Sequence, residues 1–384
     1  MRIALLGPAP PLRGGISQYN SLLHKAFADQ GHETLLVSFL RQYPEWLLPG
    51  KKQFDPEAEG RDQAALRLLD SVRPSTWKRT FRRLAGFRPD LVVLQWWHPF
   101  MAPCYRGVLR GLSREIPSCK SVMVCHNVLS HEHGRFPGRA WVERLLVRTL
   151  FKHVDAFVAH GREIISTIRE VSSGQPVLKA FLPIQDYHFS PHDPGPQPRA
   201  EDEPSRLLFF GNVRQYKGLD TLLEALARLP GDLRWRLTVA GEFYLSLESF
   251  QRQARDLGLA DRVEWKPGYL RSDQLPALFR SSDLLVLPYR AASQSGIIPL
   301  AFLFELPVLA TRVGGLPDVI EHGRNGLLVP PDDPGRLAAA IEDFLRDDPT
   351  GHLLPNIRAF RRQLSWEQVT DTILQASGEA DRQV

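Results

Sequence analysis

The sequence predicts an α/β fold with two doubly wound, Rossmann-like domains, and three observations support this prediction. The chain has 384 residues, more than one hydrophobic core usually organises. Short apolar runs alternate along it with segments of helical periodicity. A stretch rich in proline and charge, residues 190–206, separates two such series and is typical of a linker.

The apolar runs predict the strands. Each run is apolar at successive positions, which is typical of parallel strands buried on both faces. Segments of helical spacing lie between them, such as residues 218–229 and 334–347. The predicted strands are 2–7, 33–40, 90–95, 121–127 and 155–161 in the first half and 206–211, 236–242, 283–289, 307–313 and 326–331 in the second.

These elements divide the chain. We expect an N-terminal domain over residues 1–188, a linker over 189–205, a C-terminal domain over 206–360 and a final helix over 361–384. Two doubly wound domains present the carboxyl ends of their strands to a central cleft, where helix N-termini and glycine turns bind ligands. Functional residues should therefore lie directly after the strands.

Composition limits the class of protein. The chain is 43% hydrophobic and 24% charged, with a net charge of +5 and a sequence pI near 9.2, which suits phosphorylated ligands or an anionic membrane surface. Its three cysteines contain no CxxC pair, which favours reduced thiols in the cytoplasm. No run approaches about 20 apolar residues, so we expect neither a signal peptide nor a membrane span.

Two motifs suggest binding of an anion. In "GPAPPLRGGISQYN", Gly14 and Gly15 let the backbone approach a ligand at the start of a helix, although a Gly-Gly turn alone is more often just a turn. In "FFGNVRQYKGLDTLLEAL", Arg214 and Lys217 follow a strand and precede a helix. The planar guanidinium of arginine and the compact ammonium group of lysine together suit a diphosphate. We therefore favour diphosphate binding over the alternative of a merely solvated basic loop.

A third motif, "LPYRAASQSG", leads from a strand into a helix. With "GNVRQYKG", "VAGE", "PVLATRVGGLPDVI" and "NGLLV" it makes the sequence similar, over nearly the whole chain, to the retaining glycosyltransferases of family four, which have the GT-B fold. The resemblance implies transfer of a sugar from a UDP- or GDP-sugar without a metal or other cofactor. The resemblance also implies which residues bind the nucleotide-sugar donor: Gly15, Arg214, Lys217, Gln294, Ser295, Gly296 and Ile297.

The sequence departs from that family at one important place. The family carries two glutamates eight residues apart, the first near the sugar and the second on the ribose, whereas this chain has Ala292 and Leu300 there. A subset of the family resembles this sequence in having "SQSG" in this loop. By that resemblance, Gln294 is assigned to contact sugar hydroxyls. A non-catalytic nucleotide-sugar-binding protein with a degenerate site is therefore the alternative function. An epimerase or phosphorylase on the same architecture is a further alternative.

Three histidines lie within "CHNVLSHEHG". His126 directly follows a predicted strand, and by the resemblance it contacts the donor sugar and is the catalytic candidate. His131 and His133 fall in the following loop with Glu132, which is left as a base or a solvated residue. A zinc site is the weaker interpretation, because tetrahedral ligands would have to converge there, and we expect no metal.

Aromatic and basic residues indicate the acceptor side. Trp96 and Trp97 follow a strand and, with Gly14, are assigned there, although one indole is more simply explained by the core. Residues 73–88 interleave six basic residues with an apolar stripe, which fits either a helix on an anionic membrane or one packed on the sheet. We expect a glycan or lipid-linked acceptor, no nucleic acid, and a cytoplasmic protein that is peripheral at the inner membrane face if the membrane interpretation holds.

Overall fold

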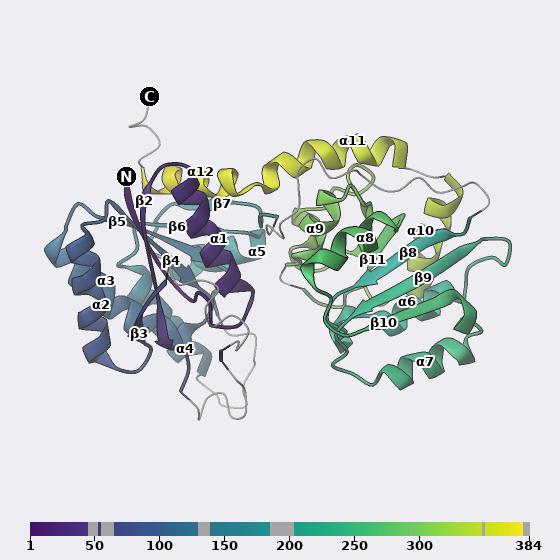
Figure 1. Cartoon of the computed structure of the whole chain (residues 1–384), viewed down its shortest axis with the longest axis horizontal. Coiled ribbons are helices and arrows are strands. Elements are labelled where there is room, and N and C mark those ends of the chain that lie inside the picture. Colours follow the sequence, from purple (N-terminus) through teal and green to yellow (C-terminus); the bar gives the residue numbers. More distant parts are fainter. Residues whose placement is uncertain are drawn as a thin grey trace. The chain divides into compact units, whose positions relative to one another are not determined.

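The computed structural model describes residues 1–44, 53–54, 65–129, 139–184, 203–292, 294–347 and 350–378. The chain forms two compact units (Figure 1). The first comprises Met1–Phe181 and the residues from Trp366 onward, and the second comprises Leu182–Ser365. Each contains one sheet whose strand pairs are all parallel within the described residues. The predicted pair of Rossmann-like α/β sheets is therefore confirmed.

The sheet of the first unit has the order β3-β2-β1-β4-β5-β6-β7. Successive strands are added toward one edge up to β3 and toward the other edge from β4 onward, so the strand order reverses between β1 and β4. Ligands of open α/β sheets bind at such a switch point. Helices α2 to α5 share one apolar core with one face of the sheet, while α12 packs against α1 and against β5, β6 and β7. The strands are β1 (Arg2–Leu6), β2 (Glu33–Arg41), β3 (Ala65–Asp70), β4 (Leu91–Trp96), β5 (Lys120–Cys125), β6 (Ala156–Ala159) and β7 (Val177–Lys179). The helices are α1 (Gly15–Asp29), α2 (Pro74–Phe87), α3 (Ala102–Glu115), α4 (Arg139–Phe151), α5 (Arg162–Val171) and α12 (Trp366–Ser377).

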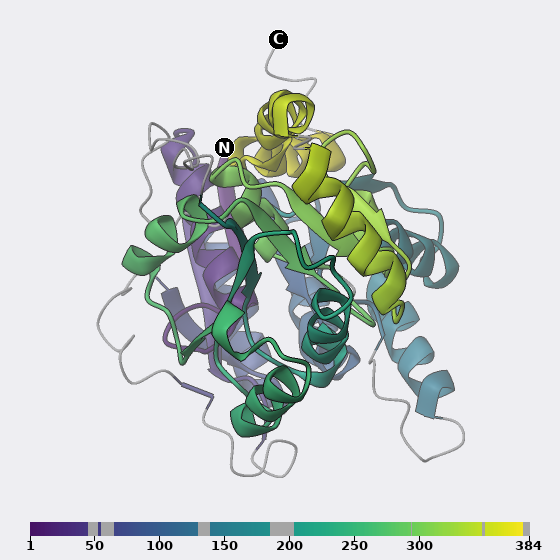
Figure 2. The same cartoon turned by 90° about the vertical axis from the view of Figure 1, so that its right-hand side faces the viewer.

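The sheet of the second unit has the order β10-β9-β8-β11-β12-β13, with its switch point between β8 and β11. Helix α6 packs against α7 and α10 (Figure 2), and α9 packs against α11. The strands are β8 (Ser205–Phe210), β9 (Trp235–Gly241), β10 (Val263–Pro267), β11 (Leu284–Leu287), β12 (Val308–Thr311) and β13 (Leu327–Val329). The helices are α6 (Leu219–Leu226), α7 (Leu247–Asp256), α8 (Leu275–Arg280), α9 (Ile297–Leu303), α10 (Pro334–Asp347) and α11 (Thr350–Arg361).

All ten predicted strands are present, and the three further strands among the described residues, β3, β7 and β10, lie at sheet edges. An edge strand is covered less completely than a central one, so its sequence need not be continuously apolar. Strand β10 shows this, because Glu264 and Lys266 interrupt its apolar residues. The units divide after Phe181 and Ser365, and the proposed linker 189–205 lies mostly outside the described residues.

The apolar stripe of α2 faces the protein interior. A Cβ atom added to Gly107 would lie 2.8 Å from the Trp77 ring, and one added to Gly111 would lie 2.5 Å from the Phe81 ring. Both aromatic side chains thus fill the space above the glycines of α3. The Trp77 indole also donates to the carbonyl oxygen of Asp70 at 2.8 Å. Of the two alternatives for residues 73–88, the structure therefore favours the helix that packs its apolar stripe on the protein.

Candidate active site

The loop between β8 and α6 approaches its neighbours so closely that glycine is required at its end. Gly218 has φ 67°, and a Cβ atom there would lie 2.0 Å from the carbonyl oxygen of Pro288. Gly241 is equally constrained, since its Cβ would lie 2.2 Å from the carbonyl oxygen of Gly211. The approach of Gly218 to Pro288 places the end of the loop that carries Arg214 beside the residue that follows β11.

Gly218→Ala should therefore destabilise the protein by about 3 kcal/mol, from left-handed backbone strain and the clash with Pro288. Chemical denaturation measures the free energy of unfolding. Gly231→Ala is the matched control, because nothing lies within 4 Å of its added Cβ. Equal stability of the two variants would contradict the close approach.

Lys217 is the buried cation of this loop. Its Nζ donates a hydrogen bond to the Tyr289 hydroxyl at 2.6 Å and lies 4.2 Å from the centre of the same ring. Burial, with a smaller contribution from Arg214, lowers the pKa of Lys217 to about 8. Among the described residues no carboxylate forms an ion pair with this ammonium group. A buried cation without a counter-ion is costly, so the site is suited to an anionic ligand.

Arg214 and Arg290 play different roles. The Arg214 guanidinium is exposed, lies 4.1 Å from the centre of the Tyr244 ring and pairs with no carboxylate in the described part of the chain. Arg290 instead pairs with Asp220 at 2.8 Å and Asp332 at 2.7 Å. It also donates to the carbonyl oxygen of Gln215 at 2.8 Å. Arg290 therefore anchors the loop, whereas Arg214 and Lys217 keep charge available for a ligand.

Tyr289 joins this loop to the segment before α9. Its buried hydroxyl accepts from Lys217. Burial raises the pKa of Tyr289, and the nearby Ser295 side chain lowers it to a smaller extent. Ile297 closes the same region, because a Cβ atom on Gly211 would lie 2.8 Å from its Cδ1 and 3.6 Å from the Lys217 Nζ. The structure thus brings Lys217, Ser295 and Ile297 together around a tyrosine that the sequence analysis did not identify.

Tyr289→Phe should weaken binding of a nucleoside diphosphate about five- to tenfold. The ammonium group has three donors, and the hydroxyl orients it through one of them, leaving two for the ligand. Losing one such hydrogen bond costs roughly 1 kcal/mol. Calorimetric titration with UDP and GDP measures the effect, and Tyr269→Phe, at an exposed tyrosine of the same unit, is the control. Unchanged affinity would show that Tyr289 does not position Lys217.

In the first unit, His126 directly follows β5. Its backbone N–H donates to the carbonyl oxygen of Trp96 at 2.8 Å, and its Nε2 lies 2.8 Å from Oε1 of the buried Gln95. A carbonyl oxygen only accepts, so Nε2 carries the proton and Nδ1 carries the lone pair. Burial, together with nearby His160, lowers the pKa of His126 to about 3. The imidazole is therefore neutral at physiological pH.

A group of buried polar side chains surrounds this histidine. The ring centre of Tyr19 lies 4.9 Å from that of His126 and 5.4 Å from that of His160. His160 Nδ1 donates to the carbonyl oxygen of Ala180 at 3.0 Å, and burial lowers the pKa of His160 to about 4. The Tyr19 hydroxyl, Gln95 Nε2 and His160 Nε2 have no hydrogen-bond partner among the described residues. Buried polar atoms nearly always find partners, so this group is suited to a ligand or to water.

Two family models match the chain. The model described as "Glycosyl transferase 4-like domain" matches residues 14–183, and the model described as "Glycosyl transferases group 1" matches residues 204–347. Together they cover most of both units, including the loops that carry His126, Arg214 and Lys217. The chain belongs to the group 1 glycosyltransferases.

This glycosyltransferase also has curated relatives. The D-inositol 3-phosphate glycosyltransferase of Mycobacterium marinum (strain ATCC BAA-535 / M) is 34% identical over 175 residues, which are 44% of this chain and 37% of that protein. The protein of the same name from Mycobacterium tuberculosis (strain ATCC 25177 / H37Ra) is 35% identical over 175 residues, 44% of this chain and 36% of that protein. The matches thus span little more than a third of these relatives.

Solved structures share the fold. The apo form of the lipopolysaccharide outer core galactosyltransferase WaaB is 17% identical with a TM-score of 0.74, covering 98% of this chain and 99% of that chain. Anabaena Alr3699/HepE in complex with UDP is 18% identical with a TM-score of 0.70, with the same coverage. Both confirm the GT-B fold of this glycosyltransferase.

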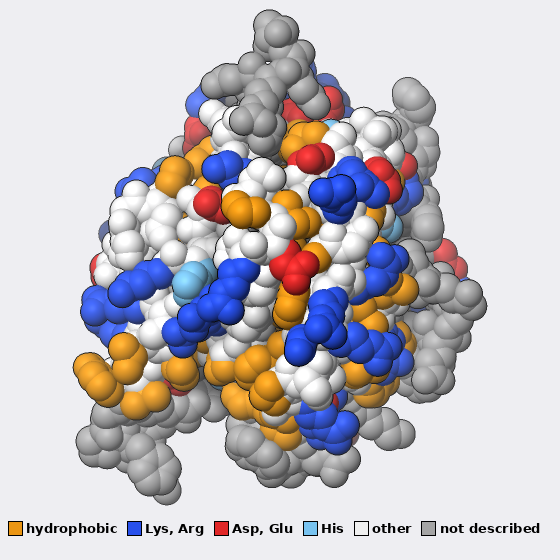
Figure 3. Space-filling model, turned by 90° about the vertical axis from the view of Figure 1, so that its left-hand side faces the viewer, with side chains coloured by type: hydrophobic (Ala, Val, Ile, Leu, Met, Phe, Trp, Pro, Cys, Tyr) orange, Lys and Arg blue, Asp and Glu red, His pale blue; other side chains and the backbone are white. Residues whose placement is uncertain are grey.

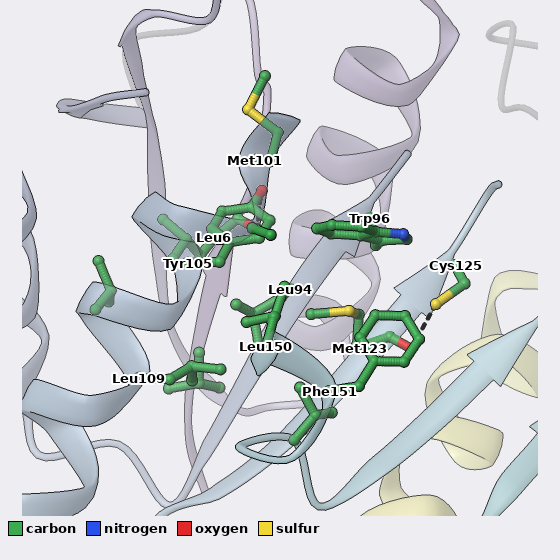
Figure 4. Packing of buried hydrophobic residues seen from close by; sticks show 14 of the residues in the cluster. Leu6, Leu94, Trp96, Met101, Tyr105, Leu109, Met123, Cys125, Leu150 and Phe151 are labelled. Atoms are coloured by element: carbon green, nitrogen blue, oxygen red, sulfur yellow. Dashed lines mark hydrogen bonds between the residues drawn. The ribbon is translucent and has the colours of Figure 1, made fainter. Parts of the chain in front are cut away.

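The assignment of Trp96 to the acceptor side is wrong. Trp96 is fully buried in the core, where its indole donates to the carbonyl oxygen of Val128 at 3.3 Å and its ring packs edge-on against Phe151 (Figure 4). It belongs to β4, which is buried at every position. Trp97, one residue beyond this strand, is half-buried and donates to the Tyr43 hydroxyl at 2.7 Å. Only Trp97 stays a prediction for the acceptor side.

The remaining predicted residues are less constrained. Gly14 and Gly15 are exposed at the start of α1, with nothing within 4 Å of an added Cβ. Gln294 has a buried Nε2 without a partner in the described chain, and Gly296 is exposed directly before α9. Leu300, where the family resemblance implies a glutamate, is buried in the core.

Some expectations fall outside what the structure describes. His131, Glu132, His133 and Ser293 are not among the described residues. Among those that are, no group of three or more His, Cys, Asp or Glu residues is placed to hold a metal ion. No helix of the described chain is long and apolar enough to cross a membrane.

Proposed function

We propose that this glycosyltransferase moves a hexosyl group from a UDP- or GDP-sugar to a glycan or lipid-linked acceptor in bacterial polysaccharide biosynthesis, with retention of anomeric configuration. The observation that carries the proposal is the cation pair after β8. Lys217 is buried, has no counter-ion among the described residues and lies on the same short loop as Arg214. A diphosphate supplies the missing negative charge.

The chemistry follows from where charge develops. As the bond between the anomeric carbon and the phosphate oxygen breaks, negative charge grows on the leaving nucleoside diphosphate. A fixed ammonium group and a guanidinium fork stabilise that charge without reorganisation. The Tyr289 hydroxyl accepts a hydrogen bond from the ammonium group and holds it in place. The two side chains supply positive charge themselves, and the proposal assigns no metal to the site.

On the sugar side, we assign His126 as the catalytic residue that contacts the transferring sugar. Gln95 fixes its Nε2 proton, which leaves the Nδ1 lone pair to accept from a sugar hydroxyl. A neutral imidazole suits hydrogen bonding to a sugar rather than proton donation. The other donor contacts that we propose are Gly15, Gln294, Ser295, Gly296 and Ile297, with Gly14 and Trp97 on the acceptor side.

Solved structures of the same fold support this substrate class. HepE of Anabaena is described in complex with UDP, with UDP and glucose, and with UDP-glucose. WaaB is described as a lipopolysaccharide galactosyltransferase. For this chain we propose the same class of donor and a place in bacterial glycan assembly. Its three cysteines are free thiols, which suits the reducing cytoplasm, and we propose that it is peripheral at the inner membrane face.

One observation favours a second candidate function. Leu300 is buried in the core and Ala292 is half-exposed, so neither position offers a carboxylate to the ribose or the sugar. A protein that binds a nucleotide-sugar without transferring it would need the cation pair but not these carboxylates. Turnover, rather than binding, separates the two functions.

A panel of UDP-, GDP- and ADP-sugars tests the proposal, with binding measured by calorimetry and slow hydrolysis by release of free sugar. Each donor is assayed with and without EDTA. One preferred donor, hydrolysed equally well with the chelator, is the expected result. Binding to one donor without hydrolysis, even with polysaccharide and lipid-linked acceptors added, would favour the binding protein. No binding to any donor would overturn both.

A further inference from the structure

The outer surface of α2, α3 and α4 is strongly basic. Together the three helices carry ten Lys and Arg residues and two acidic residues, Glu115 and Glu143. Helix α3 packs against both α2 and α4, so their outward sides form one continuous surface, the basic face. Figure 3 shows many Lys and Arg side chains in this view. The exposed cations of the basic face are Lys78, Arg79, Arg82, Arg83, Arg110, Arg114, Arg144 and Arg148.

Carboxylates of the described residues do not neutralise these cations. In the described part of the chain none of the eight forms an ion pair with a carboxylate. Such density of like charge raises the electrostatic potential over a surface and attracts an extended anionic partner. A solvated basic face alone would account for the charges, so a second feature is needed to identify the partner.

That feature is an apolar stripe on the outer side of α4. Trp141, Val142 and Leu145 are 68%, 48% and 47% exposed. Their spacings of one, three and four residues place them on the same side of the helix. The opposite side of α4 is anchored, because Val147 and Leu150 are fully buried. A large exposed aromatic side chain beside two exposed aliphatic ones is unusual on a protein surface without a partner.

We propose that the basic face docks on an anionic lipid bilayer, with Trp141, Val142 and Leu145 entering the headgroup region. Exposed cations attract anionic headgroups, and tryptophan with aliphatic neighbours gains by leaving water at the interface. A nucleic acid would satisfy the cations but would not need the apolar stripe. This docking specifies the membrane contact that the proposed function includes. The apolar side chains that enter the bilayer come from α4 and not from α2.

Sedimentation with vesicles tests the docking. The full chain should bind vesicles of phosphatidylglycerol and phosphatidylethanolamine, and bind pure phosphatidylcholine at least tenfold more weakly. The triple variant Trp141→Ser, Val142→Ser, Leu145→Ser and the triple variant Arg79→Gln, Arg82→Gln, Arg83→Gln should each lose at least tenfold in partitioning. About 1 kcal/mol per cation near the surface predicts on the order of a hundredfold for the second. Raising the salt concentration should also release the protein.

Matched controls come from the second unit. Tyr269→Ser removes an aromatic ring that is 81% exposed, and Arg236→Gln, Arg252→Gln, Arg255→Gln removes three exposed cations. Both should bind vesicles like the unaltered protein, and all variants should keep its thermal midpoint. The proposal is overturned if the protein does not bind anionic vesicles at low salt, if either α4 or α2 variant binds like its control, or if heparin and DNA bind but vesicles do not.

Donor hydrolysis keeps this test separate from the proposed reaction. Neither triple variant alters a residue assigned to the site, so hydrolysis of the nucleotide-sugar should be unchanged in both. Vesicle binding without any hydrolysis in the unaltered protein would sustain the docking and count against the reaction. Hydrolysis without vesicle binding would do the reverse.

Discussion

Lys217→Ala is expected to lower the affinity for UDP or GDP, and for the sugar donor, about a hundredfold. The substitution removes a buried ammonium group that has no carboxylate partner among the described residues. A hydrogen bond to a charged group is worth roughly 1.5–3 kcal/mol, and burial keeps this one from being screened. Calorimetry with the free nucleotide measures the loss without requiring an acceptor.

The matched control is Lys266→Ala. Lys266 is an exposed lysine of β10 in the same unit and pairs with Glu264 at 3.3 Å, so its loss should leave nucleotide affinity within about twofold. If Lys217→Ala bound UDP and GDP as tightly as the unaltered protein, the diphosphate would not lie beside this loop, and the assignments of Arg214 and Ser295 would fail with it.

The same lysine predicts the pH dependence of donor binding. Burial lowers the pKa of Lys217 to about 8 in the free protein, and a bound diphosphate favours the protonated form. The ligand thus binds the ammonium form more tightly, and affinity should fall as pH rises through about 8. In Lys217→Ala this decrease should disappear between pH 7.5 and 9.5, a range in which the diphosphate keeps its charge.

The fold was predictable because burial on both faces is recorded locally in each central strand. Strand β4 is buried at every position, and the corresponding run of the sequence is almost continuously apolar. Strand β3 pairs only with β2 and carries Arg67 in its middle, so no local pattern identifies it. Edge strands therefore account for the strands that the sequence analysis missed.

The site was only partly predictable, because its geometry depends on residues distant in sequence. Lys217 and Arg214 were recognisable from their place after a strand. Tyr289, which orients Lys217, lies 72 residues further on, and no local motif connects the two. Gln95 was hidden within an apolar run, although a polar residue near the end of a buried strand is itself a signal. The assignment of Trp96 failed because the sequence does not distinguish this buried tryptophan from its neighbour Trp97, which is only half-buried.

His126→Ala is expected to lower the turnover number for donor hydrolysis by two to three orders of magnitude while leaving affinity for the free nucleotide unchanged. Loss of one hydrogen-bonding group at the reacting centre has effects of this size. The cation pair assigned to the diphosphate, Arg214 and Lys217, lies in the second unit, so removing the imidazole should not disturb it. His153→Ala, at an exposed histidine of the first unit, is the control. Equal losses in turnover and nucleotide affinity would make His126 structural.

Two further measurements identify how His126 acts. Gln95→Met removes the oxygen that fixes the Nε2 proton, and turnover should fall about tenfold because the imidazole can then adopt the other tautomer. The pKa of His126 is lowered to about 3, so protonation of this group should not reduce turnover anywhere above pH 5. A loss of turnover with a midpoint near pH 6.5, present in the unaltered protein and absent from His126→Gln, would mean that the imidazole is exposed enough to ionise. In that case a neutral hydrogen-bonding role would have to give way to acid-base chemistry.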